Sequence, residues 1–302
     1  MINIVPLILP IEDLQLREEY AQLVPTAFHC CLDGQDPFGI NSPVLGVGAI
    51  EKGHPIAVAF ATAHMKIHSA DIHLLAIADD HAQASLVKDI LEFLTQLLIN
   101  QGMKLATFTY THEDPSSDIL EQAFTESQWQ GPQPFMVTCL FRHDNFDPNW
   151  WNKNVPLKEG FQEFLFENLT RQEEKDLIHR FEQMTIPSHI YPFGSDKNLI
   201  EYKNSLGLRY KGKVIGWMIT HRIEPNVIRY SSLYLEDEFA DTRYWLKLLI
   251  DSLRLHDAPY GILEINLNQI SKRWLKFIER RLFPHASKIT HKQMFWKNLE
   301  AG

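Results

Sequence analysis

The chain has 302 residues, of which 45% are hydrophobic and 22% charged, as in an ordinary globular protein with room for two domains. Its formal net charge of −9 argues against nucleic acid or an anionic membrane as a partner, because both require a basic face. No apolar run approaches the roughly 18–20 residues of a membrane-spanning helix, and the first residues lack the features of a signal peptide. We therefore expect a cytoplasmic protein.

The three cysteines point to no cross-link and no metal. Cys30 and Cys31 are adjacent and Cys139 is distant, which matches neither a disulfide framework nor a metal-ligand spacing. We expect three reduced thiols and no metal site.

The first half of the chain predicts one α/β unit. A helix around residues 11–28 precedes a hairpin at 44–64, which turns at Lys52-Gly53. A third strand at 71–78 leads into an acidic turn and a helix at 86–102 with apolar residues at helical spacing. A strand at 104–110, a helix at 118–127 and a closing strand at 135–142 complete the unit.

The second half repeats this order. A strand at 161–168 precedes a helix from 171, for which Thr170 and Glu173 form a capping-box pattern. There follow a hairpin at 205–223, a strand at 228–235, a helix at 243–257, a strand at 261–267, a helix at 271–281 and a strand at 292–298. Gly53 and Gly212 lie 159 positions apart, and Ala82 and Ala240 lie 158 apart. This near-constant offset predicts two copies, 1–142 and 160–302, joined by a linker at 143–159 that lacks periodicity.

This order of elements resembles the GNAT superfamily of N-acyltransferases, and the resemblance covers nearly the whole chain as a tandem pair. It implies an α/β (α+β) fold in which each copy is a mixed, mostly antiparallel sheet flanked by helices. It also implies a turn after the fourth strand with the pattern Arg/Gln-x-x-Gly-x-Gly/Ala. The amides of that turn hold the pyrophosphate of coenzyme A at a helix start. Both copies depart from the pattern, so the resemblance rests on architecture and repetition.

The two turns differ in how well they suit a pyrophosphate. The first keeps small side chains at Ala82, Ala84 and Ser85, whereas the second is acidic and carries the bulky Tyr244 and Trp245. The resemblance therefore implies that acyl-CoA, as co-substrate, binds the first copy. The expected contacts are Ala76, Ile77, Ala82, Gln83, Ala84, Ser85, Leu86 and Val87. The alternative is that neither turn binds a nucleotide.

Catalytic residues are harder to assign. In the family, a tyrosine on the helix after the fifth strand donates a proton, but Phe124 and Ile278 stand at that position here. His73 lies on the strand at 71–78, which is the fourth strand in the family's count, and it is a candidate base because imidazole titrates near neutral pH. Tyr110 is a candidate acid, and Glu264 is a candidate in the acceptor pocket of the second copy, where Tyr230 and Ser231 could also lie. For each residue, packing or solvent exposure is the alternative role.

The resemblance implies an N-acyltransferase that moves an acyl group from acyl-CoA, or from an acyl carrier protein, to an amine of a small molecule or peptide. The alternative is a catalytically inactive binding or scaffold protein of the same fold, which the missing tyrosines favour. A hydrolase that uses Ser85 or Cys31 is a weaker alternative, because no base stands at a recognisable spacing.

Overall fold

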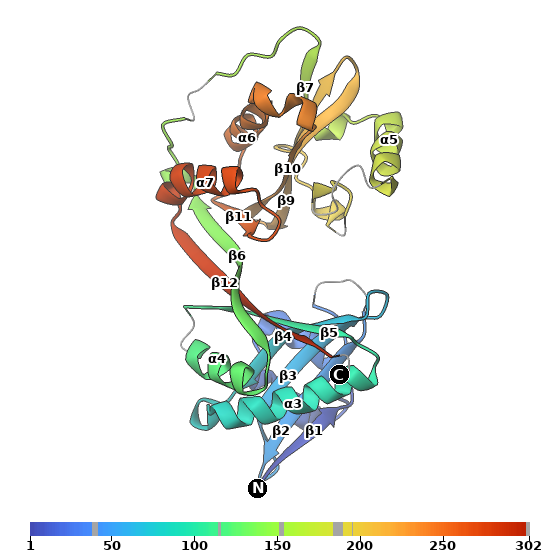
Figure 1. Cartoon of the computed structure of the whole chain (residues 1–302), viewed down its shortest axis with the longest axis vertical. Coiled ribbons are helices and arrows are strands. Elements are labelled where there is room, and N and C mark those ends of the chain that lie inside the picture. The colour runs from blue at the N-terminus through green and yellow to red at the C-terminus, as the bar shows by residue number, and fades with distance from the viewer. Residues whose placement is uncertain (38–41, 114–115, 151–153, 184–189, 195, 300–302) are drawn as a thin grey trace. The chain divides into compact units, whose positions relative to one another are not determined.

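The structure is a computed structural model that describes the whole chain except residues 38–41, 114–115, 151–153, 184–189, 195 and 300–302. The chain divides into two compact units (Figure 1). Unit 1 comprises residues 1–135 and 291–302, and unit 2 comprises residues 136–290.

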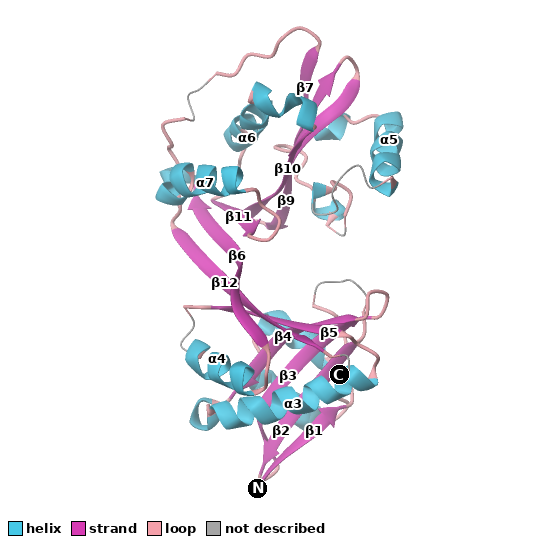
Figure 2. Ribbon diagram, viewed as in Figure 1, coloured by secondary structure: helices cyan, strands magenta, loops and turns pink. Residues whose placement is uncertain are grey.

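Unit 1 is a mixed sheet with the strand order β1-β2-β3-β4-β5-β12, in which β4 and β5 alone form a parallel pair. Helices α3 and α4 cover one face, and α1 and α2 cover the other (Figure 2). Its elements are β1 (Ile2–Leu7), α1 (Leu14–Leu23), α2 (His29–Leu32), β2 (Val44–Glu51), β3 (His54–His64), β4 (Ser69–Ile77), α3 (Ala84–Asn100), β5 (Leu105–Thr111), α4 (Ser117–Glu126) and β12 (Lys288–Asn298).

Unit 2 has the strand order β6-β11-β10-β9-β8-β7, and here β10 and β11 form the parallel pair. Helices α6 and α7 cover one face, and α5 lies on the other. Its elements are β6 (Gln130–Arg142), β7 (Phe161–Leu165), α5 (Arg171–Glu182), β8 (Leu206–Tyr210), β9 (Lys213–Glu224), β10 (Val227–Leu235), α6 (Tyr244–Arg254), β11 (Tyr260–Asn266) and α7 (Lys272–Arg281).

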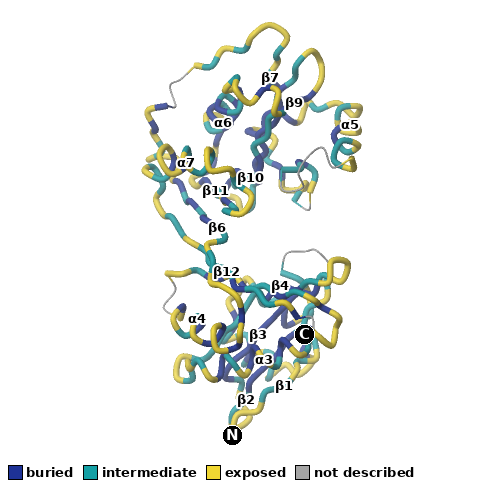
Figure 3. Tube along the Cα trace, viewed as in Figure 1, coloured by how far each residue is buried: buried dark blue, intermediate teal, exposed yellow. Residues whose placement is uncertain are grey.

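Each sheet has an apolar core on both faces, so its central strand is buried along most of its length. In β3 the residues from Ile56 to Ala63 are buried, and in β9 those from Val214 to His221 are buried (Figure 3). Burial on both faces explains why these strands read as continuous apolar runs rather than as alternating patterns.

Local sequence signals set the hairpins and the start of α5. Lys52-Gly53 and Lys211-Gly212 all have positive φ, between 48° and 89°, as the tight hairpin turns predicted at these places require. The Thr170 hydroxyl accepts a hydrogen bond from the Glu173 amide, and the Glu173 carboxylate accepts one from the Thr170 amide. The predicted capping box is therefore confirmed.

The closing strands of the two halves are exchanged. Residues Met136–Arg142 of β6 pair with β11 in unit 2, and Lys292–Asn298 of β12 pair with β5 in unit 1. The compact units therefore do not follow the expected limits of 1–142 and 160–302. The expected linker at 143–159 belongs to unit 2, where Phe146 and Trp150 pack against its core and the Trp150 indole donates to the Arg281 carbonyl. A strand pattern does not say which neighbour the strand pairs with, so the sequence alone does not predict the exchange.

The predicted fold class is confirmed, because each unit is a mixed, mostly antiparallel sheet flanked by helices. Within the described part of the chain, no helix is both long enough and apolar enough to cross a membrane.

Candidate functional site

Both units contain a pair of parallel strands that separate part of the way along. In unit 2, β10 pairs with β11 from Val227↔Tyr260 to Tyr230↔Leu263, and beyond these residues the two strands no longer pair with each other. In unit 1, β4 pairs with β5 only as far as Ile72↔Phe108. Strands that part at their carboxyl ends open a wedge in the sheet, and ligands of open α/β sheets bind at such ends.

A β-bulge marks the same place in both units. In unit 2 the register passes from Tyr230↔Thr220 to Ser232↔Ile219, so Ser231 has no partner on β9. In unit 1 it passes from Ile72↔Ala61 to Leu74↔Phe60, so His73 has none on β3. Bulges leave one residue outside the ladder and are over-represented next to active sites. The bulge residue of each copy therefore lies where its wedge opens.

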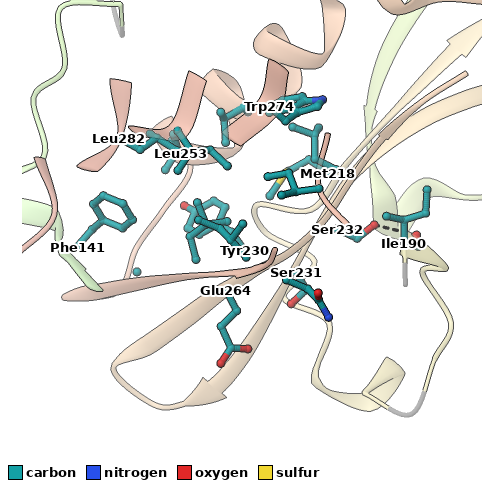
Figure 4. Close-up of a pocket in the computed structure, with 18 of the residues that line it drawn as sticks. Phe141, Ile190, Met218, Tyr230, Ser231, Ser232, Leu253, Glu264, Trp274 and Leu282 are labelled. Atoms are coloured by element: carbon teal, nitrogen blue, oxygen red, sulfur yellow. Dashed lines mark hydrogen bonds between the residues drawn. The ribbon is translucent and has the colours of Figure 1, made fainter. Parts of the chain in front are cut away.

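Unit 2 holds an apolar cavity of about 550 Å³ beside its wedge (Figure 4). Strands β10 and β11 form its floor, α6 and α7 form its roof, and Phe141 closes one end. Its apolar lining includes Phe141, Met218, Leu249, Leu253, Trp274 and Ile278.

The equivalent space in unit 1 is filled with aromatic rings. Phe108, Phe124 and Phe295 form a stack in which both ring-centroid distances are 4.7 Å, and Phe124 and Phe295 are fully buried. The strand registers show which residues are equivalent. Phe108 pairs with Ile72 and Leu263 pairs with Tyr230, and these partners directly precede the two bulges, so Phe108 is equivalent to Leu263. On the next strand, Phe295 pairs with Phe108 and Cys139 pairs with Leu263, so Phe295 is equivalent to Cys139. Phe124 on α4 corresponds to Ile278 on α7. Three large side chains in unit 1 thus replace three smaller ones in unit 2.

A second, polar pocket of about 270 Å³ shares four residues with the cavity: Tyr230, Ser231, Ser232 and Glu264. Figure 4 shows Glu264 extending away from Tyr230 and Leu253. The two pockets therefore meet at the bulge and at the part of β11 that has left β10.

Charged and polar groups in this second pocket form a network around Arg229. Its guanidinium donates to the Asp196 carboxylate, lies 3.8 Å from the Glu264 carboxylate and donates from Nε to the Ser231 hydroxyl at 3.0 Å. The Ser231 hydroxyl lies 2.7 Å from His221 Nδ1. Burial, together with the nearby Arg229 charge, lowers the pKa of His221 to about 4. The imidazole is therefore neutral at pH 7, and its Nδ1 can accept a hydrogen bond from the Ser231 hydroxyl.

One buried polar pair in the wall of the cavity is uncharged near neutral pH. The Tyr230 hydroxyl lies 3.0 Å from His256 Nδ1, and both residues are buried. Burial raises the pKa of Tyr230 and lowers that of His256. Glu264 is the one acidic lining residue, and the described lining includes no lysine or arginine. The cavity therefore suits an uncharged, apolar group.

The catalytic candidates of unit 1 do not line either pocket. His73 occupies the bulge, and burial lowers its pKa. The Tyr110 hydroxyl donates to Glu121 on α4 at 2.5 Å, and its ring lies 5.8 Å from that of Phe295. Of the three predicted catalytic residues, Glu264 alone lines the cavity and the polar pocket.

The predicted donor turn of unit 1 is accessible but flanked by carboxylates. No side chain caps the start of α3, and Ala82, Gln83 and Ser85 are exposed. Ala84 is half-buried, and the remaining members of the predicted set point into the cores: Leu86, Val87, Ala76 and Ile77. His81 lies 2.7 Å from Asp80 and 3.3 Å from Glu51, and these hydrogen bonds raise its pKa.

The matching turn in unit 2 is organised differently. Arg243 precedes α6 with φ of 65°, and the Thr242 hydroxyl accepts from the Tyr244 amide at 3.3 Å. The Tyr244 ring is buried and its hydroxyl accepts from the Lys158 amide, so this side chain does not crowd the turn. Trp245 packs edge-on against Trp274 of α7, with ring centroids 4.4 Å apart.

Four residues of the site are not among those that the sequence predicts: Asp196, His221, Arg229 and His256. A polar residue in an apolar strand was the available signal for His221 and Arg229. Asp196 and His256 come from connecting segments, and nothing in the sequence links them to the strands. No group of acidic, histidine and cysteine side chains that could hold a metal ion occurs among the residues the structure describes.

Comparison with known proteins identifies the architecture. No protein-family model and no curated protein matches the chain. Among solved structures, a tandem GNAT protein from the clavulanic acid biosynthesis pathway aligns over 100% of both chains, with a TM-score of 0.60 and 10% identity. A GCN5-related N-acetyltransferase from Sphaerobacter thermophilus aligns over 99% of this chain and 96% of its own, with a TM-score of 0.59 and 11% identity.

A third solved structure covers the chain equally well. It contains the GCN5-related glucosamine N-acetyltransferase region of a fungal multi-domain GH3 β-N-acetylglucosaminidase. It aligns over 98% of this chain and 38% of its own, with a TM-score of 0.65 and 12% identity. At such identities the likeness concerns the fold, and it extends over both halves. The chain therefore has the fold of the tandem GCN5-related N-acetyltransferases.

Proposed function

We propose that the protein is an N-acyltransferase whose working site is in unit 2. The acyl group of a thioester donor lies in the apolar cavity, and the amine acceptor enters through the polar pocket. The observation that carries this proposal is that the two pockets meet at Ser231, Ser232 and Glu264, where β10 and β11 part. A thioester carbonyl at that junction is open to an amine from the other face of the sheet.

The residues at the junction suit the chemistry of acyl transfer. A bulge frees backbone groups from the strand ladder, and a preorganised N–H beside the carbonyl stabilises the oxyanion that forms when the amine attacks. The Glu264 carboxylate accepts the proton that the amine loses as the C–N bond forms, and this proton balances the thiolate that leaves when the C–S bond breaks. Neutral His221 holds the Ser231 side chain and adds no charge to the site.

The size of the cavity favours an acyl group longer than acetyl. Burial of each methylene group contributes about 0.8 kcal/mol, and the lining offers apolar contacts from both helices and the sheet. The donor is an acyl-CoA or a carrier-bound thioester, and the acceptor is an amine of a small molecule or peptide. No metal takes part in this scheme.

Two alternatives remain specific enough to test. The exposed, uncapped start of α3 favours a donor at the turn 82–87 of unit 1. The absence of a proton-donating tyrosine at the positions of Phe124 and Ile278 favours a protein that binds an acyl group without transferring it.

Thiol release from octanoyl-CoA with a panel of primary amines tests the proposal. We expect turnover by the wild-type protein and a decrease in kcat of about 100-fold or more in Glu264→Gln, since removal of a general base costs about that much. The Kd for octanoyl-CoA measured by calorimetry should not change, because the amide retains the shape of the carboxylate. Equal turnover by the two proteins would remove Glu264 from the mechanism. Binding of octanoyl-CoA without turnover on any amine would favour the binding protein.

A further inference from the structure

Helix α7 carries an unusual concentration of positive charge. Five of its ten residues are basic and exposed: Lys272, Arg273, Lys276, Arg280 and Arg281. Glu279 is its one acidic residue. Helix α4, at the same place in unit 1, has three acidic residues and no basic one. This charge is therefore a property of the second copy and not of the fold.

The arrangement of these cations opposes helix stability. Lys272, Lys276 and Arg280 follow one another at a spacing of four residues, so like charges are neighbours on one face. Lys272 and Arg273 also lie in the first turn, where the helix dipole disfavours positive charge. We call Lys272, Arg273, Lys276 and Arg280 the basic face of α7. An anionic partner would remove both penalties.

Within the protein itself this charge is almost uncompensated. Across the described residues, the one ion pair recorded for the basic face joins Arg273 to Asp241 at 3.8 Å, and both side chains are at least 80% exposed. Such a pair contributes little. By contrast, Arg180 and Arg209 of the same unit lie within 2.6 Å of a carboxylate. The basic face is thus available to a ligand from outside.

The same helix forms part of the roof of the cavity. Trp274 and Ile278 line the cavity from one side of α7, and the basic face lies on its exposed side. A partner resting on α7 is therefore about one helix diameter, roughly 10 Å, from the cavity. This arrangement links recognition of an anion to delivery of the acyl group.

A free nucleotide is a poor match for this surface. The pyrophosphate of coenzyme A would bind at the start of α6, but Asp237, Glu238 and Asp241 are exposed there, and Thr242 already accepts from the first helical amide. The basic face extends from Lys272 to Arg280, about 12 Å along the helix axis. That length matches the side of an acidic helix better than a single phosphate group.

We propose that the basic face of α7 docks a small acidic carrier protein, which presents the acyl group as a phosphopantetheine thioester. This inference rests on the proposed function, since the cargo would enter the apolar cavity. Unit 1 has 7 lysines and arginines against 18 acidic residues, and unit 2 has 22 against 20. An acidic carrier would therefore be repelled by unit 1 and steered to unit 2.

The test compares two probes on three proteins. One probe is the apo form of a bacterial fatty-acid acyl carrier protein, which lacks the phosphopantetheine group. The other probe is octanoyl-CoA. The proteins are the wild type, the variant K272E/K276E/R280E and the control R171E/K175E/K197E, which reverses three exposed cations elsewhere in unit 2. Kd is measured for each combination at about 50 and about 300 mM salt.

We expect the α7 variant to bind the apo carrier at least about tenfold more weakly than the wild type, and the control to stay within about twofold. Higher salt should weaken carrier binding to the wild type, and octanoyl-CoA should bind all three proteins alike. The proposal is overturned if the wild type does not bind the carrier at low salt, or if the α7 variant binds it normally. It is also overturned if the variant loses octanoyl-CoA by the same factor, since the basic face would then bind nucleotide phosphate. If none of the three proteins binds octanoyl-CoA while the wild type still binds the carrier, the proposed acyl site in the cavity is refuted and the proposed docking surface is not.

Discussion

Units 1 and 2 share their order of elements, their parting strands and their bulge, yet the space beside the wedge is filled in one and empty in the other. The difference comes from three equivalent positions, which hold Phe108, Phe124 and Phe295 in unit 1 and Leu263, Ile278 and Cys139 in unit 2. Cores are packed nearly as densely as crystals, so a few ring volumes decide whether a cavity exists. The backbone of both copies could hold a ligand, and the side chains leave room for one in unit 2.

The bulge sites differ in a related way. The bulge residue is His73 in unit 1 and Ser231 in unit 2. On the neighbouring strand, Thr62 of β3 is equivalent to His221 of β9. Each copy therefore keeps one histidine and one hydroxyl, but on opposite strands. In unit 2 the histidine is buried beside an arginine, which keeps it neutral.

The largest difference between the units should appear when the equivalent residues Phe124 and Ile278 are each replaced by alanine and the free energy of unfolding is measured. Phe124→Ala removes a fully buried ring from the stack and should lower the free energy of unfolding by about 3–5 kcal/mol. Ile278→Ala should cost about 2 kcal/mol, because its side chain already borders a cavity and the added void is small. Urea unfolding measures both values. Equal losses would mean that the two spaces are packed alike.

Substitution of His221 by threonine, its counterpart in unit 1, should change the pH dependence of stability. The pKa of His221 is about 4 in the folded protein and about 6.5 in the unfolded chain, so between these values the unfolded chain alone binds the proton. The wild type should therefore lose about 2 kcal/mol of stability between pH 7 and pH 5 through this residue, and His221→Thr should not. Urea titrations at the two pH values give the difference. Identical pH dependence would show that His221 is not held neutral by burial.

A bulky residue at the turn of unit 1 should have the smallest effect. Ser85 is exposed at the uncapped start of α3, and Ser85→Trp would block any phosphate there. If donor binds in unit 2, the Kd for octanoyl-CoA should change by less than about twofold. A loss of more than about tenfold, which is about 1.4 kcal/mol, would instead place the donor at residues 82–87.

The hairpins and the cap of α5 could be predicted because each depends on residues close in sequence, and the repeat could be predicted because such local patterns recur at a near-constant offset. Lys52-Gly53 and Lys211-Gly212 fix their turns, and Thr170 with Glu173 fixes the start of α5. The exchange of β6 and β12 could not be predicted, because their apolar pattern indicates a strand but not the strand with which it pairs. The cavity in unit 2 depends on the combined size of side chains from β11, β6 and α7. These residues are far apart in sequence, so no local pattern predicts whether they fill the space.

The predicted site residues show the same division. The strand that carries Glu264 predicts a place in the acceptor pocket for this residue, and Glu264 lines both pockets. The network that surrounds it includes Asp196 and Arg229, which are 33 residues apart in sequence and meet only in the folded unit. The sequence ranking of the two turns used side-chain size at the helix starts, whereas the contrast between the units lies deeper in their cores.

Calorimetric titration of octanoyl-CoA and acetyl-CoA into the wild type and L263F/I278F tests the central claim most directly. This double variant places in unit 2 the aromatic side chains that fill unit 1. We predict that the wild type binds octanoyl-CoA at least about tenfold more tightly than acetyl-CoA, because six more methylene groups enter the cavity. The variant should lose that preference and keep its affinity for acetyl-CoA. Equal binding of octanoyl-CoA by the wild type and the variant would contradict the assignment of the acyl site to unit 2.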